Sequence, residues 1–253
     1  MTNLKQDLVV QLESMAAAYP DRWRVSSCGV TGSKRSIPAL LDKNVKTPGS
    51  NTPSVLLFSG LSGSADGVSL ALHTLQSIQA AGAGPANYIS FAAIPDCNPD
   101  GLRDLSAGYP PTGDFFYSAE EPEKRYLWRW ICFQAPSLIL ELGSGEQVSW
   151  RSNDAGSNLT SALSRSPGVV VENGSLLAAL GSGSPNGLGP IPGLRLTSPL
   201  EGLDSELAKL WELLSDQPGL IGASSARQVL EARSGRSYLE VAHILASVYG
   251  YRL

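Results

Sequence analysis

The first part of the chain changes from a helical to an extended pattern of apolar positions. Apolar residues recur every three to four positions from Leu4 and predict a helix over residues 4–19, with Pro20 after its end. Two extended runs follow, residues 23–30 and 36–41, and the turn-forming residues 31–34 join them. The pattern therefore predicts an opening helix and a pair of strands.

Three short apolar runs further along the chain have the pattern of buried strands. They cover residues 55–58, 88–94 and 138–142, and each ends at turn-forming residues. Helical patterns over residues 68–80 and 120–133 separate them. This alternation is typical of an α/β protein with a parallel or mixed sheet covered on both faces. In such sheets the functional side chains lie on loops at the carboxyl ends of the strands.

The segment from residue 143 to residue 194 has a different composition. It is rich in Gly, Ser, Asn and Pro, most of all over residues 181–193, and it offers few apolar side chains. We expect a long surface loop or lid here. Helices are predicted again over residues 203–214 and 238–249. With no repeat and no linker visible, residues 1–253 are predicted to form one domain.

Composition narrows the classes of function. The net charge of −4 and the lack of a basic stripe argue against nucleic acid as a partner. No apolar run approaches the roughly 20 residues that a membrane helix needs. The first 20 residues carry acidic side chains and lack the apolar segment of a signal peptide, so a cytoplasmic location is expected. Cys28, Cys97 and Cys132 are widely spaced and are interpreted as reduced, buried thiols.

Four segments in order resemble the zinc carboxypeptidase superfamily, which includes the succinylglutamate desuccinylase and aspartoacylase branch. They are YPDRWRVSSCGVTGSKRSIPALL near the start, VLLFSGLSGSADGVSLALHTL from Val55, AAIPDCNPDGLRDL from Ala92, and EEPEKRYLWRWICFQAPSLILELGSGE from Glu120. The match covers residues 10–146. It implies one α/β domain with a central mixed, mostly parallel sheet of about eight strands and helices on both faces.

The resemblance also implies where catalytic groups should lie, and those groups are missing. Family members bind zinc through a His-x-x-Glu pair after the first core strand and a His after a later one. The matching positions hold Ser62, Ala65 and Gly143, none of which is a usable zinc ligand. The family's substrate-binding Asn-Arg pair falls near Gly113 and Asp114. The resemblance places the family's general-base Glu near Thr197 or Ser198.

Other groups could supply a metal site or a nucleophile. Acidic side chains near the strand ends could hold Mg²⁺ or Ca²⁺ through oxygen atoms: Asp66, Asp100, Asp114, Glu141 and Glu146. Ser62 lies in Gly-Leu-Ser-Gly-Ser, which approaches a nucleophile elbow. The acidic side chains are better interpreted as solvated or turn carboxylates. The segment around Ser62 is better interpreted as a plain Gly/Ser turn after a strand. Cys97 is interpreted as an inert thiol, and His73 and His243 as surface residues.

Two hypotheses of different class follow. The favoured one is a zinc carboxypeptidase-like protein without its metal site and with no cofactor: a non-catalytic pseudoenzyme that binds a small molecule, peptide or protein partner. The candidate cleft comprises Ser62, Asp66, Asn98, Asp100, Asp114, Glu141 and Ser144. The alternative is an active carboxypeptidase- or deacylase-type hydrolase that uses zinc at a relocated site or a non-metal mechanism.

Overall fold

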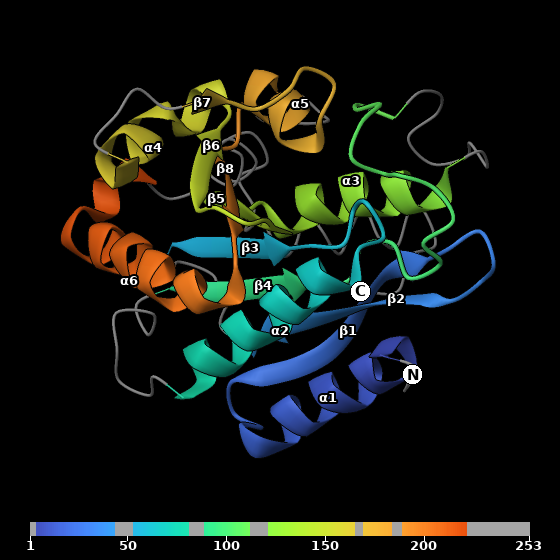
Figure 1. Cartoon of the computed structure of the whole chain (residues 1–253). Helices are drawn as coiled ribbons and strands as arrows, with labels where there is room; N and C mark the ends of the chain where they lie inside the picture. Colours follow the sequence, from blue (N-terminus) through green and yellow to red (C-terminus); the bar gives the residue numbers. More distant parts are fainter. Residues whose placement is uncertain are drawn as a thin grey trace, which may run out of the picture.

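A single eight-stranded sheet forms the centre of the computed structural model, which describes residues 4–43, 53–80, 89–111, 121–164, 169–183 and 189–221. The strand order across the sheet is β1-β2-β4-β3-β5-β8-β6-β7. Figure 1 shows β3 and β4 in the middle of the molecule. The strands are β1 (Trp23–Val30), β2 (Ser36–Asp42), β3 (Ser54–Phe58), β4 (Ser90–Ile94), β5 (Leu138–Ser144), β6 (Ser149–Ser152), β7 (Val169–Val170) and β8 (Gly193–Ser198).

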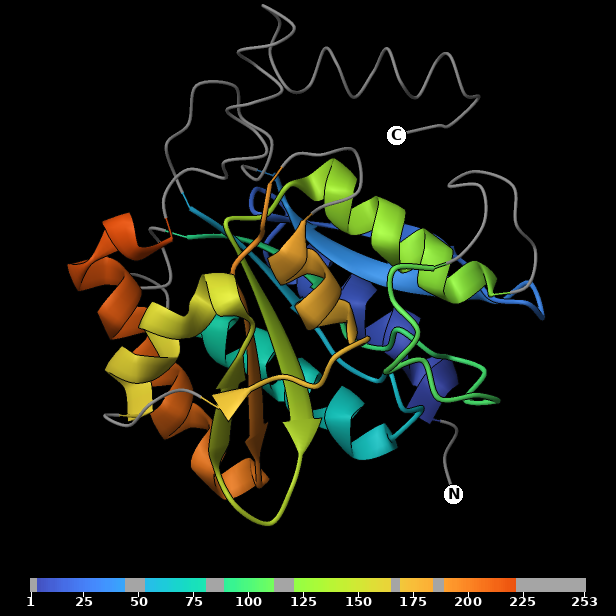
Figure 2. The same ribbon diagram turned by 90° about the horizontal axis from the view of Figure 1, so that it is seen from above.

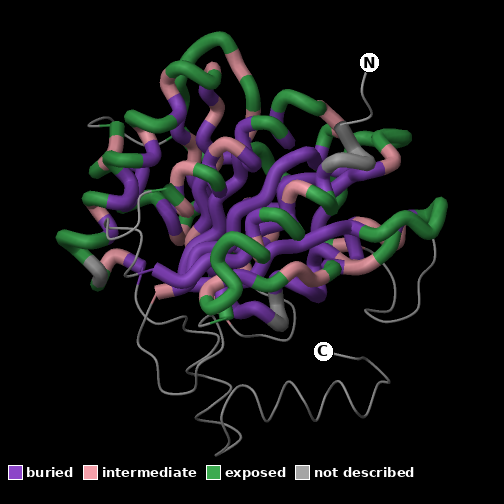
Figure 3. The backbone as a smooth tube through the Cα atoms, turned by 90° about the horizontal axis from the view of Figure 1, so that it is seen from below, coloured by how far each residue is buried: buried purple, intermediate pink, exposed green. Residues whose placement is uncertain are grey.

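The sheet is mixed, as predicted. Its core, β4-β3-β5-β8, is parallel throughout. The hairpin β1-β2 joins β4 in antiparallel orientation, and at the other side β6 runs antiparallel to β8 and parallel to β7. The central strands β3 and β4 are buried at every position, because helices cover both faces. Figure 3 shows the buried backbone running through the middle of the molecule.

Helices lie on both faces of the sheet (Figure 2). One apolar core joins the sheet to α1 (Leu4–Ala18), α2 (Ala65–Ala80), α4 (Ser157–Ser164) and α6 (Leu200–Asp216). The other joins the opposite face to α3 (Pro122–Gln134) and α5 (Leu176–Ser182). Two short 3₁₀ helices, η3 (Asp154–Gly156) and η5 (Pro218–Leu220), complete the described elements. None of the helices among these residues is long and apolar enough to cross a membrane.

Most predicted elements are confirmed with small shifts at their ends. The predicted helix over residues 68–80 begins at Ala65, and the one over residues 120–133 is α3. The predicted helix over residues 203–214 is part of the longer α6. The helix predicted over residues 238–249 lies outside the described residues, as does His243.

The prediction of a long loop or lid over residues 143–194 is wrong for the part that the structure describes. That part contains β6, η3, α4, β7 and α5, and β8 begins at Gly193. A few fully buried leucines anchor these short elements, among them Leu159, Leu176 and Leu180. The glycines of this segment allow close packing: a Cβ on Gly181 or Gly193 would lie under 3.0 Å from the side chain of Asn153.

Candidate strand-end pocket

The carboxyl ends of β3, β5 and β8 meet at one edge of the sheet because these three strands are parallel neighbours. A tight turn leaves β3 and leads into α2. The Ser59 hydroxyl donates to the carbonyl of Leu142 at 2.7 Å and ties this turn to β5. Gly60 and Gly63 both have positive φ, so the turn needs glycine at these positions. The turn is thereby fixed against the end of the neighbouring strand.

A pocket of about 220 Å³ opens at this edge. It contains three of the predicted site residues, Ser62, Glu141 and Ser144, together with the predicted zinc-ligand position Gly143. Serine hydroxyls and one pair of charges make up most of its polar lining. The lining residues are Ser59, Gly60, Leu61, Ser62, Ser64, Gly67, Ser106, Glu141, Leu142, Gly143, Ser144 and Arg195. We call it the strand-end pocket.

Glu141 and Arg195 face each other across β5 and β8, where they are register partners. Arg195 Nε lies 3.0 Å from Glu141 Oε2, and the side chains are 17% and 11% exposed. The Nε–H is not directed at that oxygen, so the contact is an ion pair without an aligned hydrogen bond. The pair is nevertheless close enough for strong mutual attraction at this degree of burial.

The pKa values of the two partners shift for different reasons. Burial raises the pKa of the Glu141 carboxyl above its usual range, and the opposing effect of Arg195 does not cancel it. Burial works to lower the pKa of Arg195, but the charges of Glu141 and Glu172 outweigh it and raise that pKa. Because a guanidinium stays protonated in either case, the titratable member of the pair is Glu141.

The charge pair continues away from the pocket. Arg195 Nη1 lies 2.8 Å from Glu172 Oε2, and the other oxygen of Glu172 contacts Nη1 of Arg151 on β6. Charges therefore alternate over four side chains, from Glu141 on β5 to Arg151 on β6. The sequence pattern alone did not indicate either residue: Glu172 lies in the segment interpreted as a loop, and Arg195 directly follows that segment. The alternation of apolar and polar residues in Gly193–Ser198 was the available signal for β8.

The other predicted site residues line two further pockets. Asp66 and Glu146 lie at a pocket of about 480 Å³ between the starts of α2 and α6, and this pocket also contains Ser144 and Ser198. Since Ser144 lines both, the 480 Å³ pocket adjoins the strand-end pocket. Asn98 and Asp100 line a separate pocket of about 180 Å³. Asp114 lies outside the described residues, as does Gly113.

Asn98 and Asp100 hold the backbone of their loop. Asn98 Nδ2 donates to the carbonyls of Leu61 and Arg103, and its Oδ1 accepts from the N–H of Gly101. These bonds connect the loop after β4 to the turn after β3, beside the strand-end pocket. The predicted Asn-Pro-Asp-Gly turn is therefore present, and the Asn98 side chain fixes its position.

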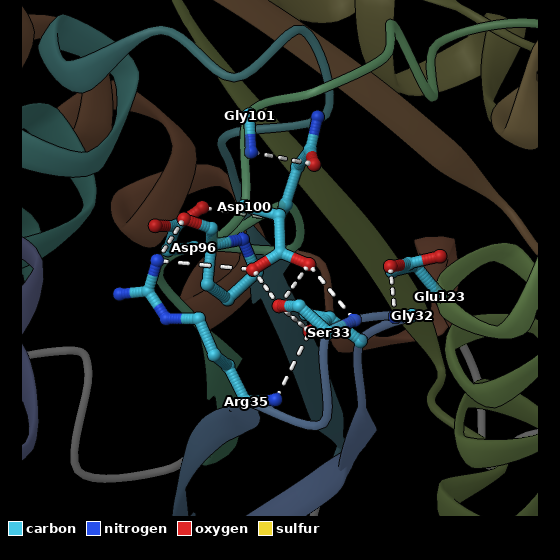
Figure 4. A network of polar contacts seen from close by, with 10 residues as sticks. Gly32, Ser33, Arg35, Asp96, Asp100, Gly101 and Glu123 are labelled. Carbon is cyan, nitrogen blue, oxygen red and sulfur yellow. Dashed lines mark hydrogen bonds and ion pairs between the residues drawn. The ribbon is translucent and has the colours of Figure 1, made fainter.

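Asp100 attaches the β1–β2 turn to this loop (Figure 4). The Ser33 hydroxyl donates to Asp100 Oδ1 at 2.6 Å, and Arg35 Nη1 lies 3.7 Å from the same oxygen. Glu123 accepts from the N–H of Gly32 at 2.7 Å and holds the other side of the turn. Partial burial tends to raise the pKa of Asp100, but the hydrogen bonds from Ser33 and Thr31 and the charge of Arg35 lower it overall.

The residues present do not fit a catalytic zinc ion at the positions that the resemblance implies. Zinc needs imidazole, thiolate or carboxylate ligands, whereas Ser62, Ala65 and Gly143 occupy these positions. Across the part of the chain that the structure describes, no three His, Cys, Asp or Glu side chains gather into a possible metal site. The described members of the predicted oxygen cluster are divided among three pockets, because they follow different strands and helices.

The other side chains considered for catalysis are a histidine and two cysteines, and their surroundings indicate structural roles. His73 Nε2 lies 3.0 Å from Asp204 Oδ2 and links α2 to α6, at a half-buried position that lines none of the three pockets. Cys97 is buried, and burial raises the pKa of its thiol well above the usual range. Cys28 is likewise a buried free thiol. Thiols in this state are poor nucleophiles.

Comparison with known proteins identifies the architecture. The sequence matches no protein-family model and no curated protein sequence. In structure, the chain is similar to a metallo-carboxypeptidase from Burkholderia cenocepacia, with a TM-score of 0.62 at 12% identity over 85% of this chain and 68% of that one. It is also similar to carboxypeptidase A from Helicoverpa armigera, with a TM-score of 0.57 at 14% identity over 85% and 72% of the two chains.

A third similar structure is bovine thrombin-activatable fibrinolysis inhibitor, solved in complex with tick carboxypeptidase inhibitor. Its TM-score is 0.55 at 14% identity, and the match covers 84% of this chain and 97% of that one. The structural similarity shows a shared fold, and sequence identities this low leave the activity open. The sheet order, the two helical layers and these similarities together give one conclusion: the chain has the metallo-carboxypeptidase fold.

Proposed function

We propose that this protein is a non-catalytic member of the metallo-carboxypeptidase fold that binds a small polar molecule or a peptide at the strand-end pocket. The observation that carries the proposal is the chemistry of the pocket lining. Ser62 and Gly143 stand where two zinc ligands are expected, and the pocket's one carboxylate, Glu141, is already paired with Arg195. The donor set suits hydrogen bonding to a ligand better than metal coordination.

The dimensions of the site support a ligand of modest size. The strand-end pocket holds about 220 Å³, and the adjoining pocket about 480 Å³, with Ser144 on the boundary. Together they reach the range typical of small-molecule sites, roughly 300–1,000 Å³. Hydroxyls of Ser62, Ser64 and Ser144 can donate to or accept from a polar ligand. A short peptide could occupy both pockets by passing Ser144.

The first experiment is the zinc content of protein purified without a chelating tag under metal-replete conditions. The proposal expects far less than one zinc per chain and no hydrolysis of C-terminal or N-acyl amino acid substrates. Binding would then be measured by thermal shift and NMR with short peptides and N-acyl amino acids. Ser62→Phe should abolish binding by filling the pocket, and Ser161→Phe, at an exposed position on α4, is the matched control.

A hydrolase without the expected zinc site is the second candidate, and one observation favours it. Glu141 is a buried carboxyl with a raised pKa in a serine-lined pocket, an environment that suits a general acid or base. If this candidate holds, Glu141→Gln abolishes substrate hydrolysis, whereas Glu212→Gln, an exposed change on α6, leaves it intact. Stoichiometric zinc or hydrolysis that depends on Glu141 would overturn the non-catalytic proposal.

A further inference from the structure

The strand-end pocket contains its own cation. Among its lining residues the charged ones are Glu141 and Arg195, and they pair with each other. A lone buried carboxylate at this place would attract a metal ion, because its charge would have no compensation. Arg195 neutralises this carboxylate and so removes that attraction.

The position of this cation is fixed from two sides. Glu141 contacts Nε of Arg195 and Glu172 contacts its Nη1, while Glu172 is itself held by Arg151. The backbone also fixes the pair, since Arg195 and Glu141 are register partners on adjacent parallel strands. A guanidinium keeps its charge at every pH at which proteins are folded. Arg195 is therefore a permanent, immobilised partner of the pocket's carboxylate.

A divalent ion bound by Glu141 would lie beside this guanidinium, because Arg195 Nε is 3.0 Å from Glu141 Oε2. Repulsion between like charges at such a distance is large when the site is partly shielded from water. The ion would also compete with Arg195 for Glu141. The missing donor side chains are thus one obstacle to metal binding, and the charge of Arg195 is a second and independent one.

Building on the metal-free function proposed above, we propose that Arg195 is the resident cation of the strand-end pocket and excludes divalent metal ions from it. Supplying the three missing ligands alone would then leave zinc binding weak. Zinc would bind tightly only when the charge of Arg195 is also removed. The zinc content of the unaltered protein tests only the metal-free function proposed above. The role of Arg195 needs its own variants.

The test begins with the triple variant Ser62→His, Ala65→Glu, Gly143→His. Ser62 and Ala65 are exposed, and a Cβ at Gly143 would meet Thr197 Oγ1 at an ordinary 3.6 Å, so these side chains have space. Arg195→Gln and Arg195→Met are each added to the triple variant, giving two ways to remove the charge. Arg195→Lys keeps the charge. Arg151→Gln is the matched control, because Arg151 belongs to the same ion-pair series but does not line the pocket.

Zinc affinity is measured by equilibrium dialysis, and ligand geometry by the absorption spectrum of bound Co²⁺. Circular dichroism and thermal unfolding identify the variants that fold. We expect the neutral Arg195 variants to bind zinc at least about 100-fold more tightly than the triple variant. The triple variants that also carry Arg195→Lys or Arg151→Gln should bind zinc as weakly as the triple variant alone. Equal zinc affinity with and without the Arg195 charge, whether high or low, overturns the proposal.

Discussion

The side chain of Asn153 accepts a hydrogen bond from the backbone N–H of Gly193 at 3.0 Å and thereby joins the end of β6 to the start of β8. The same oxygen accepts from Gly156 N–H, and the Asn153 amide donates to the carbonyls of Leu177 and Ile191. One buried amide thus bonds to four backbone groups in a region whose composition resembles a loop.

Asn153→Ala should destabilise the protein strongly. The substitution leaves the N–H of Gly193 and two buried carbonyls without their hydrogen-bond partner, whereas Gly156 N–H keeps its bond to the backbone carbonyl of residue 153. We expect a loss of about 2–4 kcal/mol in the free energy of unfolding. Chemical denaturation measures this loss. Asn158→Ala, at an exposed position on α4, should change stability by less than about 0.5 kcal/mol. Equal effects of the two substitutions would contradict the role given to Asn153.

Gly193→Ala should also destabilise, by overpacking. A Cβ at this position would meet Leu177 Cδ2 at 2.8 Å and Asn153 Nδ2 at 2.9 Å. We expect a cost of about 1–3 kcal/mol, read from the shift in thermal unfolding. Gly219→Ala is the control, since a Cβ there meets nothing within 4 Å. A Gly193→Ala protein as stable as the control would show that the segment can relax around a methyl group.

Glu141 should make stability depend on pH in a defined direction. Burial raises its folded-state pKa above the ordinary value of 4.5, so the native state holds the proton more tightly than the unfolded state does. The stabilisation is fully present below the unfolded-state pKa and is lost as pH rises through the folded-state pKa. Relative to Glu141→Gln, the wild-type protein should therefore lose stability over this window. Denaturation series at several pH values measure the difference, and a gain with rising pH would contradict it.

Asp100 should show the opposite dependence. Although partial burial works against it, hydrogen bonds from Ser33 and the charge of Arg35 lower the folded-state pKa of Asp100 below the ordinary 3.8. Its stabilisation is present above that value and is lost as pH falls through the folded-state pKa. Asp100→Asn should cost about 1 kcal/mol at neutral pH and less in acid.

A double-mutant cycle with Ser33→Ala separates this contact from other effects of the Asp100 substitution. We expect a coupling of about 0.5–2 kcal/mol between the two positions, since Ser33 donates to Asp100 through both its hydroxyl and its N–H. Asp154→Asn, an exposed change in η3, should show no coupling with Ser33→Ala. Additive effects at Ser33 and Asp100 would mean that the turn is held by Glu123 instead.

The sequence was sufficient for the elements with strong apolar periodicity. The strand β1 has its predicted bounds, and α3 lies within a few residues of its own. The strands β3 and β5 also lie within a few residues of theirs, because burial on both faces of a sheet requires uninterrupted apolar runs. The turn after β3 could likewise be predicted, since Gly60 and Gly63 adopt positive φ that glycine alone tolerates easily. These features depend on residues that are close together in the chain, so the local sequence pattern predicts them directly.

Only the tertiary structure decided how residues 143–194 fold and which charges meet at the pocket. A few buried leucines and Asn153 hold the described part of this segment, and three of the four backbone groups that Asn153 bonds lie 24 to 40 residues away in the chain. The pairing of Glu141 with Arg195 likewise depends on β8 lying beside β5 in one register. No local pattern encodes such a contact, because it exists only after strands distant in sequence have become neighbours.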